Sequence, residues 1–268
     1  MAFHWKKPWE KKPPKIGLVL SGGGLRGIGH LGAIRALEEY GIKPSIISGC
    51  SAGAIIGACY AAGLSVEEML QIVQNNDLFP TRSLRFRKTG FLDTGYLSSL
   101  IQKYIPENTF ESLKIPLHVS TTDIWLAKTV YIHSGPLDQA LLASSSIPFI
   151  FPAVTQNGST YYDGGLLDNL PVTPLLGQCH YLIGIHVNAL DHPASEQLSS
   201  LKMLDRVIHL AIGQAVVRNA QKCDLFIEPP NMLQFGLFDK KQLMPMVEYV
   251  YNHTLEQLAT NPIFVRRQ

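Results

Sequence analysis

A serine between two glycines is the pattern in this chain that is best suited to chemistry. The pentapeptide Gly49-Cys50-Ser51-Ala52-Gly53 lies between a short apolar run and a run of small residues. A strand that turns sharply into a helix can present Ser51 as a nucleophile, and Gly49 and Gly53 leave room where a Cβ would clash. The start of that helix also directs N–H groups and the positive end of its dipole at an oxyanion formed there.

A second glycine cluster, Ser21 to Gly27, follows another short apolar run, Ile16 to Leu20. His30 to Tyr40 then has the periodicity of a helix, which Gly41 ends. Consecutive glycines leave backbone N–H groups uncovered, as an oxyanion or phosphate site requires. The spacing Gly-x-Gly-x-x-Gly is also that of a dinucleotide-binding loop, which calls for an acidic residue at the end of the next strand. No carboxylate is present at Ile46 to Gly49, which disfavours that alternative.

The order of three motifs resembles the patatin-like phospholipase family. These are the Gly-Gly-Gly-x-Arg-Gly loop, the Gly-x-Ser-x-Gly pentapeptide and Asp163-Gly164-Gly165. The run Ser144 to Pro152 and the tetrapeptide Asp168-Asn169-Leu170-Pro171 are similar to the bacterial members. The resemblance covers Lys15 to Glu228, which is most of the chain.

The resemblance implies a catalytic dyad without histidine, in which Ser51 is the nucleophile and Asp163 its base. It also implies that the glycine loop forms the oxyanion hole, with residues Gly22, Gly23, Gly24, Leu25, Arg26 and Gly27. A carboxylate with a pKa near its reference value of about 3.9 is a poor base for a serine hydroxyl. We therefore expect burial to raise the pKa of Asp163. The implied activity is hydrolysis of lipid esters through an acyl-enzyme, with no metal or organic cofactor.

Alternatives remain for the charged residues of these motifs. Asp163 taken alone could be an Asx-turn residue that ends a strand. Asp168 is the nearest competitor as a base, but Asn169 and Pro171 resemble a helix start, so Asp168 is better suited to ordering that turn. Arg26 could line the oxyanion site or anchor the loop through an ion pair, and we favour the supporting role.

A conventional triad also stays open, because the chain has nine histidines and the order Ser, Asp, His is available. His186 follows the apolar run Leu182 to Ile185, and catalytic groups collect at strand ends in α/β folds. A lone histidine in that setting is more often structural. The alternatives to the dyad are thus an α/β-hydrolase-type esterase that uses His186 and a non-catalytic lipid-binding or regulatory protein. No motif residue is missing, which gives the second alternative no support.

The coarse pattern predicts an α/β fold with three layers, α/β/α, and a mostly parallel central sheet covered on both faces. The predicted strands are Ile16 to Leu20, Ser45 to Ser48, Leu117 to Thr122, Thr129 to His133, Tyr161 to Asp163, Leu182 to Val187 and Leu225 to Glu228. Helices fall between most of them. Ser65 to Glu68 and Asn108 to Glu111 have the spacing of helix starts. The uncharged stretch Ala52 to Leu64 is too short to span a bilayer and suits a buried helix.

Length and composition suit one enzyme domain, since 268 residues with 46% apolar content can bury a sizeable core. We expect a basic tail over residues 1–14 and a single catalytic domain over 15–268. The net charge of +2 is too small to indicate nucleic-acid binding, and the four cysteines lack metal-binding spacing. The lysine-rich N-terminus has no apolar signal-peptide core, so we expect a cytoplasmic protein.

Two segments bear on the substrate, a lipid or phospholipid ester. Phe149 and Phe151 lie in an apolar stretch close in sequence to Asp163, and they could pack in the core or line an acyl-chain pocket. Thr81 to Gly90 carries four basic residues interleaved with Leu84 and Phe86. That segment could be a solvated face or a lid that guides the protein to the periphery of an anionic membrane. The oligomeric state stays open.

Overall fold

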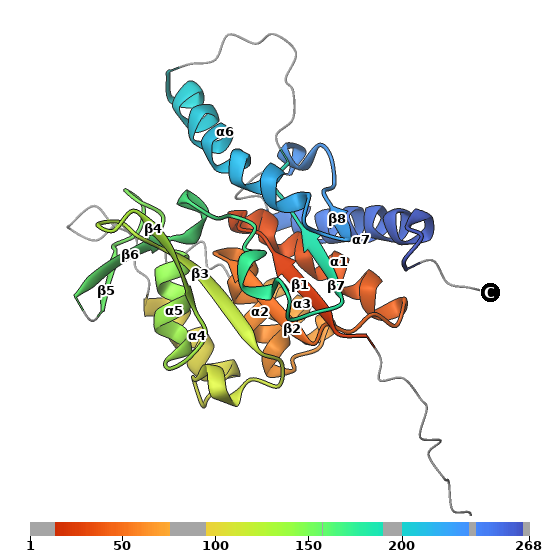
Figure 1. Cartoon of the computed structure of the whole chain (residues 1–268), viewed down its shortest axis with the longest axis horizontal. Helices are drawn as coiled ribbons and strands as arrows, with labels where there is room; N and C mark the ends of the chain where they lie inside the picture. The colour runs from red at the N-terminus through yellow and green to blue at the C-terminus, as the bar shows by residue number, and fades with distance from the viewer. Residues whose placement is uncertain (1–13, 76–94, 157, 190–199, 236–239, 265–268) are drawn as a thin grey trace, which may run out of the picture.

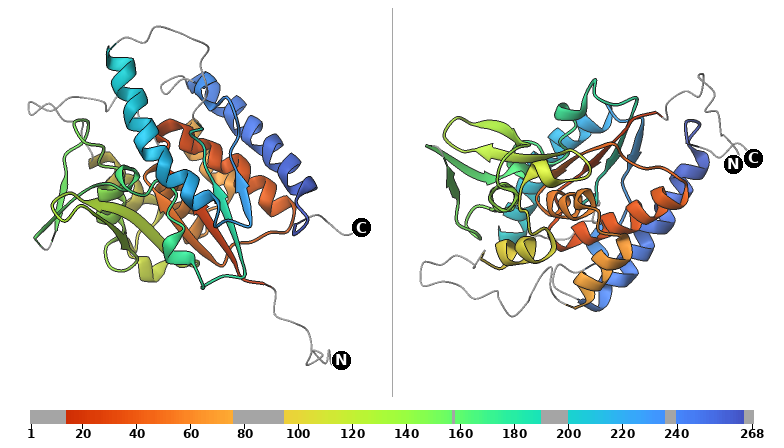
Figure 2. Two further views of the ribbon diagram at one scale, coloured as in Figure 1. Left: turned by 45° about the horizontal axis from the view of Figure 1, so that its top comes forward. Right: turned by 90° about the horizontal axis from the view of Figure 1, so that it is seen from below.

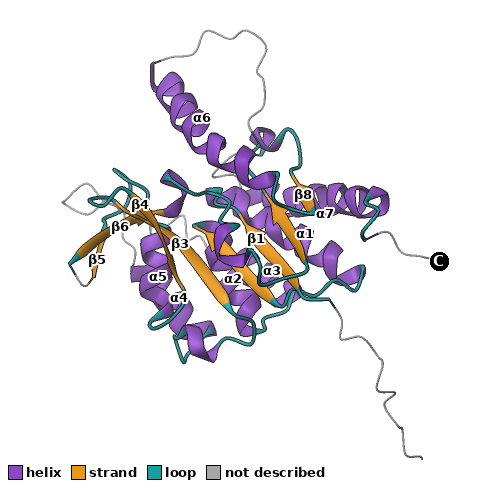
Figure 3. Ribbon diagram, viewed as in Figure 1, coloured by secondary structure: helices purple, strands orange, loops and turns teal. Residues whose placement is uncertain are grey.

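The protein is described by a computed structural model in which one sheet of eight strands is flanked by helices (Figures 1 and 3). The structure describes residues 14–75, 95–156, 158–189, 200–235 and 240–264. The strands are β1 (Ile16–Leu20), β2 (Ile46–Cys50), β3 (Leu117–Asp123), β4 (Lys128–Ile132), β5 (Val154–Gln156), β6 (Ser159–Asp163), β7 (Tyr181–Ile185) and β8 (Leu225–Ile227). Their order is β5-β6-β3-β2-β1-β7-β8, and β4 pairs with β3.

The sheet has a parallel part and an antiparallel part. Strands β3, β2, β1, β7 and β8 are parallel to their neighbours in that order. Strands β4 and β6 both run antiparallel to β3, and β5 runs antiparallel to β6. The predicted three-layer α/β/α fold is confirmed, and its parallel pairing holds for five of the eight strands. Strand β5 was not among the predicted strands.

Helices cover both faces of the sheet. They are α1 (Gly29–Glu39), α2 (Ala52–Ala62), α3 (Val66–Gln74), α4 (Gly95–Tyr104), α5 (Leu137–Ser144), α6 (Ser200–Ala220) and α7 (Leu243–Thr260). Helix α7 lies along α1 (Figure 2), where a Cβ at Gly32 would come within 2.1 Å of the Val247 carbonyl oxygen. No helix in the described ranges is long and apolar enough to cross a bilayer.

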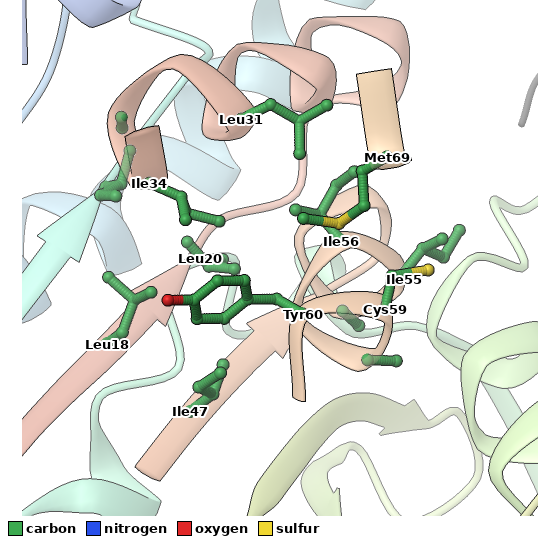
Figure 4. Packing of buried hydrophobic residues seen from close by; sticks show 14 of the residues in the cluster. Leu18, Leu20, Leu31, Ile34, Ile47, Ile55, Ile56, Cys59, Tyr60 and Met69 are labelled. Carbon is green, nitrogen blue, oxygen red and sulfur yellow. The ribbon is translucent and has the colours of Figure 1, made fainter. Parts of the chain in front are cut away.

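Side chains of β1 alternate between two hydrophobic clusters, as the pleat of a strand requires. Leu18 and Leu20 belong to the larger cluster and pack with Ile34 of α1 and Tyr60 of α2 (Figure 4). Val19 points to the other face and belongs to a smaller cluster with Val216 of α6. Strand β1 is therefore buried on both faces, which is typical of a central parallel strand.

One of the two predicted helix starts is confirmed. Ser65 and Glu68 form a reciprocal capping box at the start of α3, with Ser65 N–H donating to Glu68 at 2.8 Å. The prediction at Asn108 to Glu111 is wrong, because only a short 3-10 turn, Phe110–Ser112, forms there. The carboxylate of Glu111 instead accepts the N–H of Gly135 at 3.0 Å. The buried helix predicted after Ser51 is α2, whose residues are buried up to Ala61.

Strand β3 brings the ends of two other strands together. One edge of β3 pairs with β4, so β2 and β6 must share the other edge. On that edge Ser120 pairs with Cys50 at the end of β2, and the next residue, Thr121, pairs with Asp163 at the end of β6. Because β2 and β6 run in opposite directions, their last residues, Cys50 and Asp163, lie next to each other beside β3.

Candidate active site

Ser51 lies at the turn between β2 and α2 with φ of 50° and ψ of −122°. A positive φ is uncommon for a residue with a side chain and costs about 1–3 kcal/mol. A Cβ at Gly49 would come within 2.7 Å of the backbone of Ala54. A Cβ at Gly53 would come within 2.4 Å of the carbonyl oxygen of Leu20. The two glycines therefore allow α2 to pack against β1 and β2 while the turn between them holds Ser51.

Asp163 is in contact with the Ser51 hydroxyl, which lowers the pKa of its carboxyl group. Its Oδ1 also accepts the N–H of Gly165 at 2.7 Å and the thiol of Cys50 at 3.7 Å. Burial raises the pKa of Asp163 to about 6, although these three contacts oppose that change. A buried carboxylate with this pKa is a better base than one in water, and near neutral pH it is still mostly ionised.

Ser144 holds the backbone of Ser51. Its Oγ accepts the N–H of Ser51 at 2.8 Å and donates to the Ser120 carbonyl at 2.7 Å. Two residues later, the carbonyl of Ser146 accepts the N–H of Asp163 at 2.9 Å. The end of α5 is thus attached to both Ser51 and Asp163. The sequence analysis quoted the run that begins at Ser144 but assigned it no role, because nothing local marks which of its three serines faces the site.

The glycine loop lies directly against Ser51. A Cβ at Gly22 would come within 3.3 Å of the Cβ of Ser51, and one at Gly27 would come within 2.4 Å of the Cβ of Ala52. Gly24 has φ of 55°, and a 3-10 helix, Gly24–Ile28, begins there. The loop therefore occupies the place that an oxyanion hole for Ser51 needs.

The expectation that every loop residue contributes to the oxyanion hole requires a correction. The N–H of Gly22 donates to Asn169, to Oδ1 at 3.1 Å and to the carbonyl at 3.3 Å, so Gly22 anchors the loop. From its sequence Asn169 was expected only as part of a helix start, and its contact with the glycine loop could not be predicted. In the part of the chain that the structure describes, no hydrogen bond takes up the N–H of Gly23 or Gly24, and both residues are at least partly exposed.

Arg26 has a supporting contact. Its side chain is buried and donates a hydrogen bond to the Oδ1 of Asn188, which follows β7. The anchor described here is an amide oxygen. The backbone N–H of Arg26 is also occupied, since it donates to the Gly23 carbonyl at 3.1 Å.

Asp168 belongs to a separate network. Its carboxylate accepts the hydroxyl of Tyr131 at 2.6 Å and the amide of Asn219 at 2.9 Å. Burial raises the pKa of this carboxyl group too. Asp168 thereby links β4 and α6 to the turn after β6. The helix expected at Asn169 does not form, and a 3-10 turn begins only at Thr173.

His186 follows β7 and has its own partners. Its Nδ1 lies 2.7 Å from Glu228 Oε1, and its ring stacks on Phe226. Strand β7 is separated from β2 by β1, so the ends of β7 and β2 are about 10 Å apart at the usual strand spacing. The Ser51 hydroxyl acts on Asp163, whereas His186 is held by Glu228, and this arrangement gives the triad no support.

The two phenylalanines are placed differently. Phe149 is 93% exposed with φ of 68°, so the core-packing alternative is wrong for it, while Phe151 is half-buried.

The basic segment Thr81 to Gly90 and the tail 1–13 lie outside the described residues. Within the described ranges, no three His, Cys, Asp or Glu side chains form a group that could hold a metal ion.

A model of the family described as patatin-like phospholipase matches residues 18–176, which is more than half of the chain. The chain belongs to the patatin-like phospholipase family. The match includes the glycine loop, the serine turn and Asp163, and it continues through the Asn169 contact. The resemblance identified from the motifs is therefore confirmed.

Relatives of this patatin-like chain include longer proteins. It is 32% identical over 166 residues to an uncharacterized NTE family protein of Mycobacterium tuberculosis, which covers 61% of this chain and 46% of that protein. It is 32% identical over 280 residues to lysophospholipase NTE1 of Kluyveromyces lactis, covering 90% of this chain and 19% of that protein. The chain thus spans about half or less of the length of these relatives.

A solved structure with a similar fold is VipD from Legionella pneumophila. The TM-score is 0.54 at 16% sequence identity, and the alignment covers 93% of this chain and 67% of VipD. The similarity agrees with the patatin-like fold of three layers described above.

Proposed function

We propose that the protein is a serine acyl hydrolase that cleaves carboxylic esters of lipids through a Ser51–Asp163 dyad. Ser51 Oγ attacks the ester carbonyl carbon while Asp163 takes its proton. The tetrahedral intermediate collapses, Asp163 protonates the departing alcohol, and an acyl-enzyme remains. Water, deprotonated by Asp163, then attacks the acyl-enzyme, and the fatty acid leaves as Ser51 regains its proton.

The observation that carries this proposal is the contact of the Ser51 hydroxyl with a buried carboxyl group, Asp163, whose pKa is raised to about 6. The strained turn keeps that hydroxyl in place, and Ser144 fixes the backbone behind it. The N–H groups of Gly23 and Gly24 are the donors that we assign to the oxyanion hole. Each such donor is typically worth about 10²–10³ in kcat.

The substrate class follows from the family and its named relatives. The yeast relative is named lysophospholipase, and the family is that of patatin-like phospholipases. We infer that this chain takes a fatty acyl ester of a phospholipid or lysophospholipid. Phe149 and Phe151 would contact the acyl chain. Peripheral contact with an anionic membrane remains part of this proposal.

Labelling with a fluorescent fluorophosphonate tests the proposal. The full chain should be labelled, and the label should be absent from Ser51→Ala. Ser146→Ala is the matched control, because its hydroxyl donates to Leu142 within α5 and should leave labelling intact. Release of fatty acid from lysophosphatidylcholine should follow the same pattern. A folded protein that takes no label and releases no fatty acid would favour the non-catalytic lipid-binding alternative.

A further inference from the structure

The hairpin between β3 and β4 ends in three consecutive exposed apolar side chains, termed here the apolar tip. Ile124, Trp125 and Leu126 are 40%, 78% and 60% exposed. Single exposed apolar residues are common on soluble proteins, but a contiguous group with a tryptophan at its centre marks a contact surface.

The apolar tip lies at the same edge of the sheet as the candidate active site. On β3, Ser120 and Thr121 pair with Cys50 and Asp163, beside the nucleophile. The chain continues in the same direction through Asp123 and reaches the tip at Ile124. At about 3.3 Å per residue, the tip begins about 10 Å beyond the level of Ser51 and Asp163.

The backbone of the apolar tip needs no water to satisfy its donors. The carboxylate of Asp123 accepts the N–H groups of Trp125 at 3.1 Å and Leu126 at 2.9 Å. The N–H of Ile124 donates to the carbonyl of Thr160 on β6 at 3.1 Å. The hydrogen bonds from Leu126 and Trp125 also keep the pKa of Asp123 low, so this carboxylate stays ionised. Three satisfied donors lower the cost of moving the tip from water to a lipid interface.

The side chains around the apolar tip match a lipid interface better than a protein partner. Tryptophan prefers the boundary between lipid headgroups and acyl chains, and an exposed lysine next to it can reach the phosphates. Lys128 is exposed and pairs with Asp123 at the base of the hairpin. On the neighbouring β5–β6 hairpin, Thr155 is exposed and polar.

We propose that the apolar tip inserts into the surface of a phospholipid membrane and so brings the end of the sheet that carries Ser51 close to the lipid that carries the ester. The choice of a lipid surface as occupant rests on the proposed function. Insertion of about 5–10 Å, typical of interfacial elements, would be enough to immerse the three side chains.

Co-sedimentation with vesicles tests this proposal without turnover. The full chain carrying Ser51→Ala is mixed with vesicles of equimolar phosphatidylcholine and phosphatidylglycerol. Adding Trp125→Ala and Leu126→Ala should lower the partition coefficient about tenfold or more, whereas Thr155→Ala should leave it unchanged. Equal binding by the tip variant and the control would overturn the proposal.

Tryptophan fluorescence gives a second measurement that does not depend on a variant of the tip. The chain has three tryptophans, and Trp5→Phe with Trp9→Phe leaves Trp125 alone. Adding the same vesicles should shift its emission to the blue, and brominated lipid should quench it. If the blue shift instead grows with protein concentration in the absence of vesicles, a second copy of the chain covers the tip. The lipid proposal would then fail.

Kinetics separate this proposal from the proposed function. With Ser51 present, the tip variant should be labelled by fluorophosphonate at the unaltered rate and should lose about tenfold in hydrolysis of vesicle phospholipid. If no variant is labelled but Trp125 still inserts, the dyad proposal fails and the docking proposal stands. If labelling is normal and Trp125 does not insert, only the docking proposal fails.

Discussion

The two parts of the sheet differ in burial, and each supplies one member of the proposed dyad. Strands β1 and β2 are buried along their whole length, and Ser51 follows β2. Strands β4, β5 and β6 are mostly half-exposed, and Asp163 ends β6 as its one fully buried residue. The proposed nucleophile, Ser51, thus follows a strand that is buried along its whole length. The proposed base, Asp163, is the buried last residue of a strand that is otherwise half-exposed.

This difference shows how the proposed reaction and the stability of the fold can depend on different residues. Holding Ser51 at a positive φ requires close approach of α2 to β1, which only glycine permits. The raised pKa of Asp163 requires burial of a charge, which weakens the folded state. The packing of α2 on β1 and the burial of Asp163 can be altered separately by substitution.

Gly53→Ala should have the largest effect on stability. Its Cβ would come within 2.4 Å of the carbonyl oxygens of Leu20 and Ser21, so β1 or α2 must move. We expect a loss of about 3 kcal/mol or more in the free energy of unfolding, measured by urea denaturation. Gly158→Asn in the β5–β6 turn is the control from the antiparallel part. There φ is +80° and nothing lies within 4 Å, so the change should be about 0.5 kcal/mol or less. Equal losses would contradict the contrast between the two parts.

Asp163→Asn should stabilise the protein at neutral pH. Burial raises the pKa of Asp163 from 3.8 to about 6, so the folded state keeps a proton that the unfolded state releases between these values. The wild-type chain therefore loses stability as pH rises through about 6, and the asparagine variant does not. The free energy of unfolding of the variant relative to wild type should rise by up to about 3 kcal/mol from pH about 4 to about 7. A difference that stays constant across this range would contradict the burial argument.

Ser144→Ala should have the smallest effect of the three. It removes the acceptor of the Ser51 N–H, which is buried, at a cost of about 1–3 kcal/mol. We expect the labelling rate of Ser51 to fall about tenfold, equivalent to ~1.4 kcal/mol in the barrier. Ser146→Ala should change it by about twofold or less, because the Oγ of Ser146 donates to the carbonyl of Leu142 in α5. Similar losses in both variants would mean that the end of α5 acts through packing alone.

The sequence predicted the parts of the site that are local. A strand, a serine and a small-residue helix occur in one stretch, so the turn at Ser51 could be predicted, and so could the glycine loop after β1. The meeting of β2 and β6 beside β3 could not, because it depends on strand pairing between distant segments. The same is true of Gly22, whose N–H is bonded to a residue 147 positions away.

Two further outcomes show the limit of local patterns. Phe149 is apolar and lies in an apolar run, yet its backbone adopts φ of 68° and turns the ring into solvent. The spacing at Asn108 to Glu111 is that of a helix start, but the Glu111 carboxylate bonds to Gly135 in place of its own turn. At Glu111 a contact with a distant segment takes up the carboxylate. Around Phe149 a local turn sets the conformation, since the N–H groups of Ile150 and Phe151 donate to the carbonyl of Ile147.

The rate of fluorophosphonate labelling in three variants tests the dyad most directly. The variants are Asp163→Asn, Asp168→Asn and His186→Ala, each checked for folding by circular dichroism. We predict that Asp163→Asn lowers the rate about 10²–10⁴-fold, as expected for loss of a general base, while the other two stay within about tenfold of wild type. Loss of labelling in His186→Ala, with normal labelling in Asp163→Asn, would contradict the dyad and support the triad.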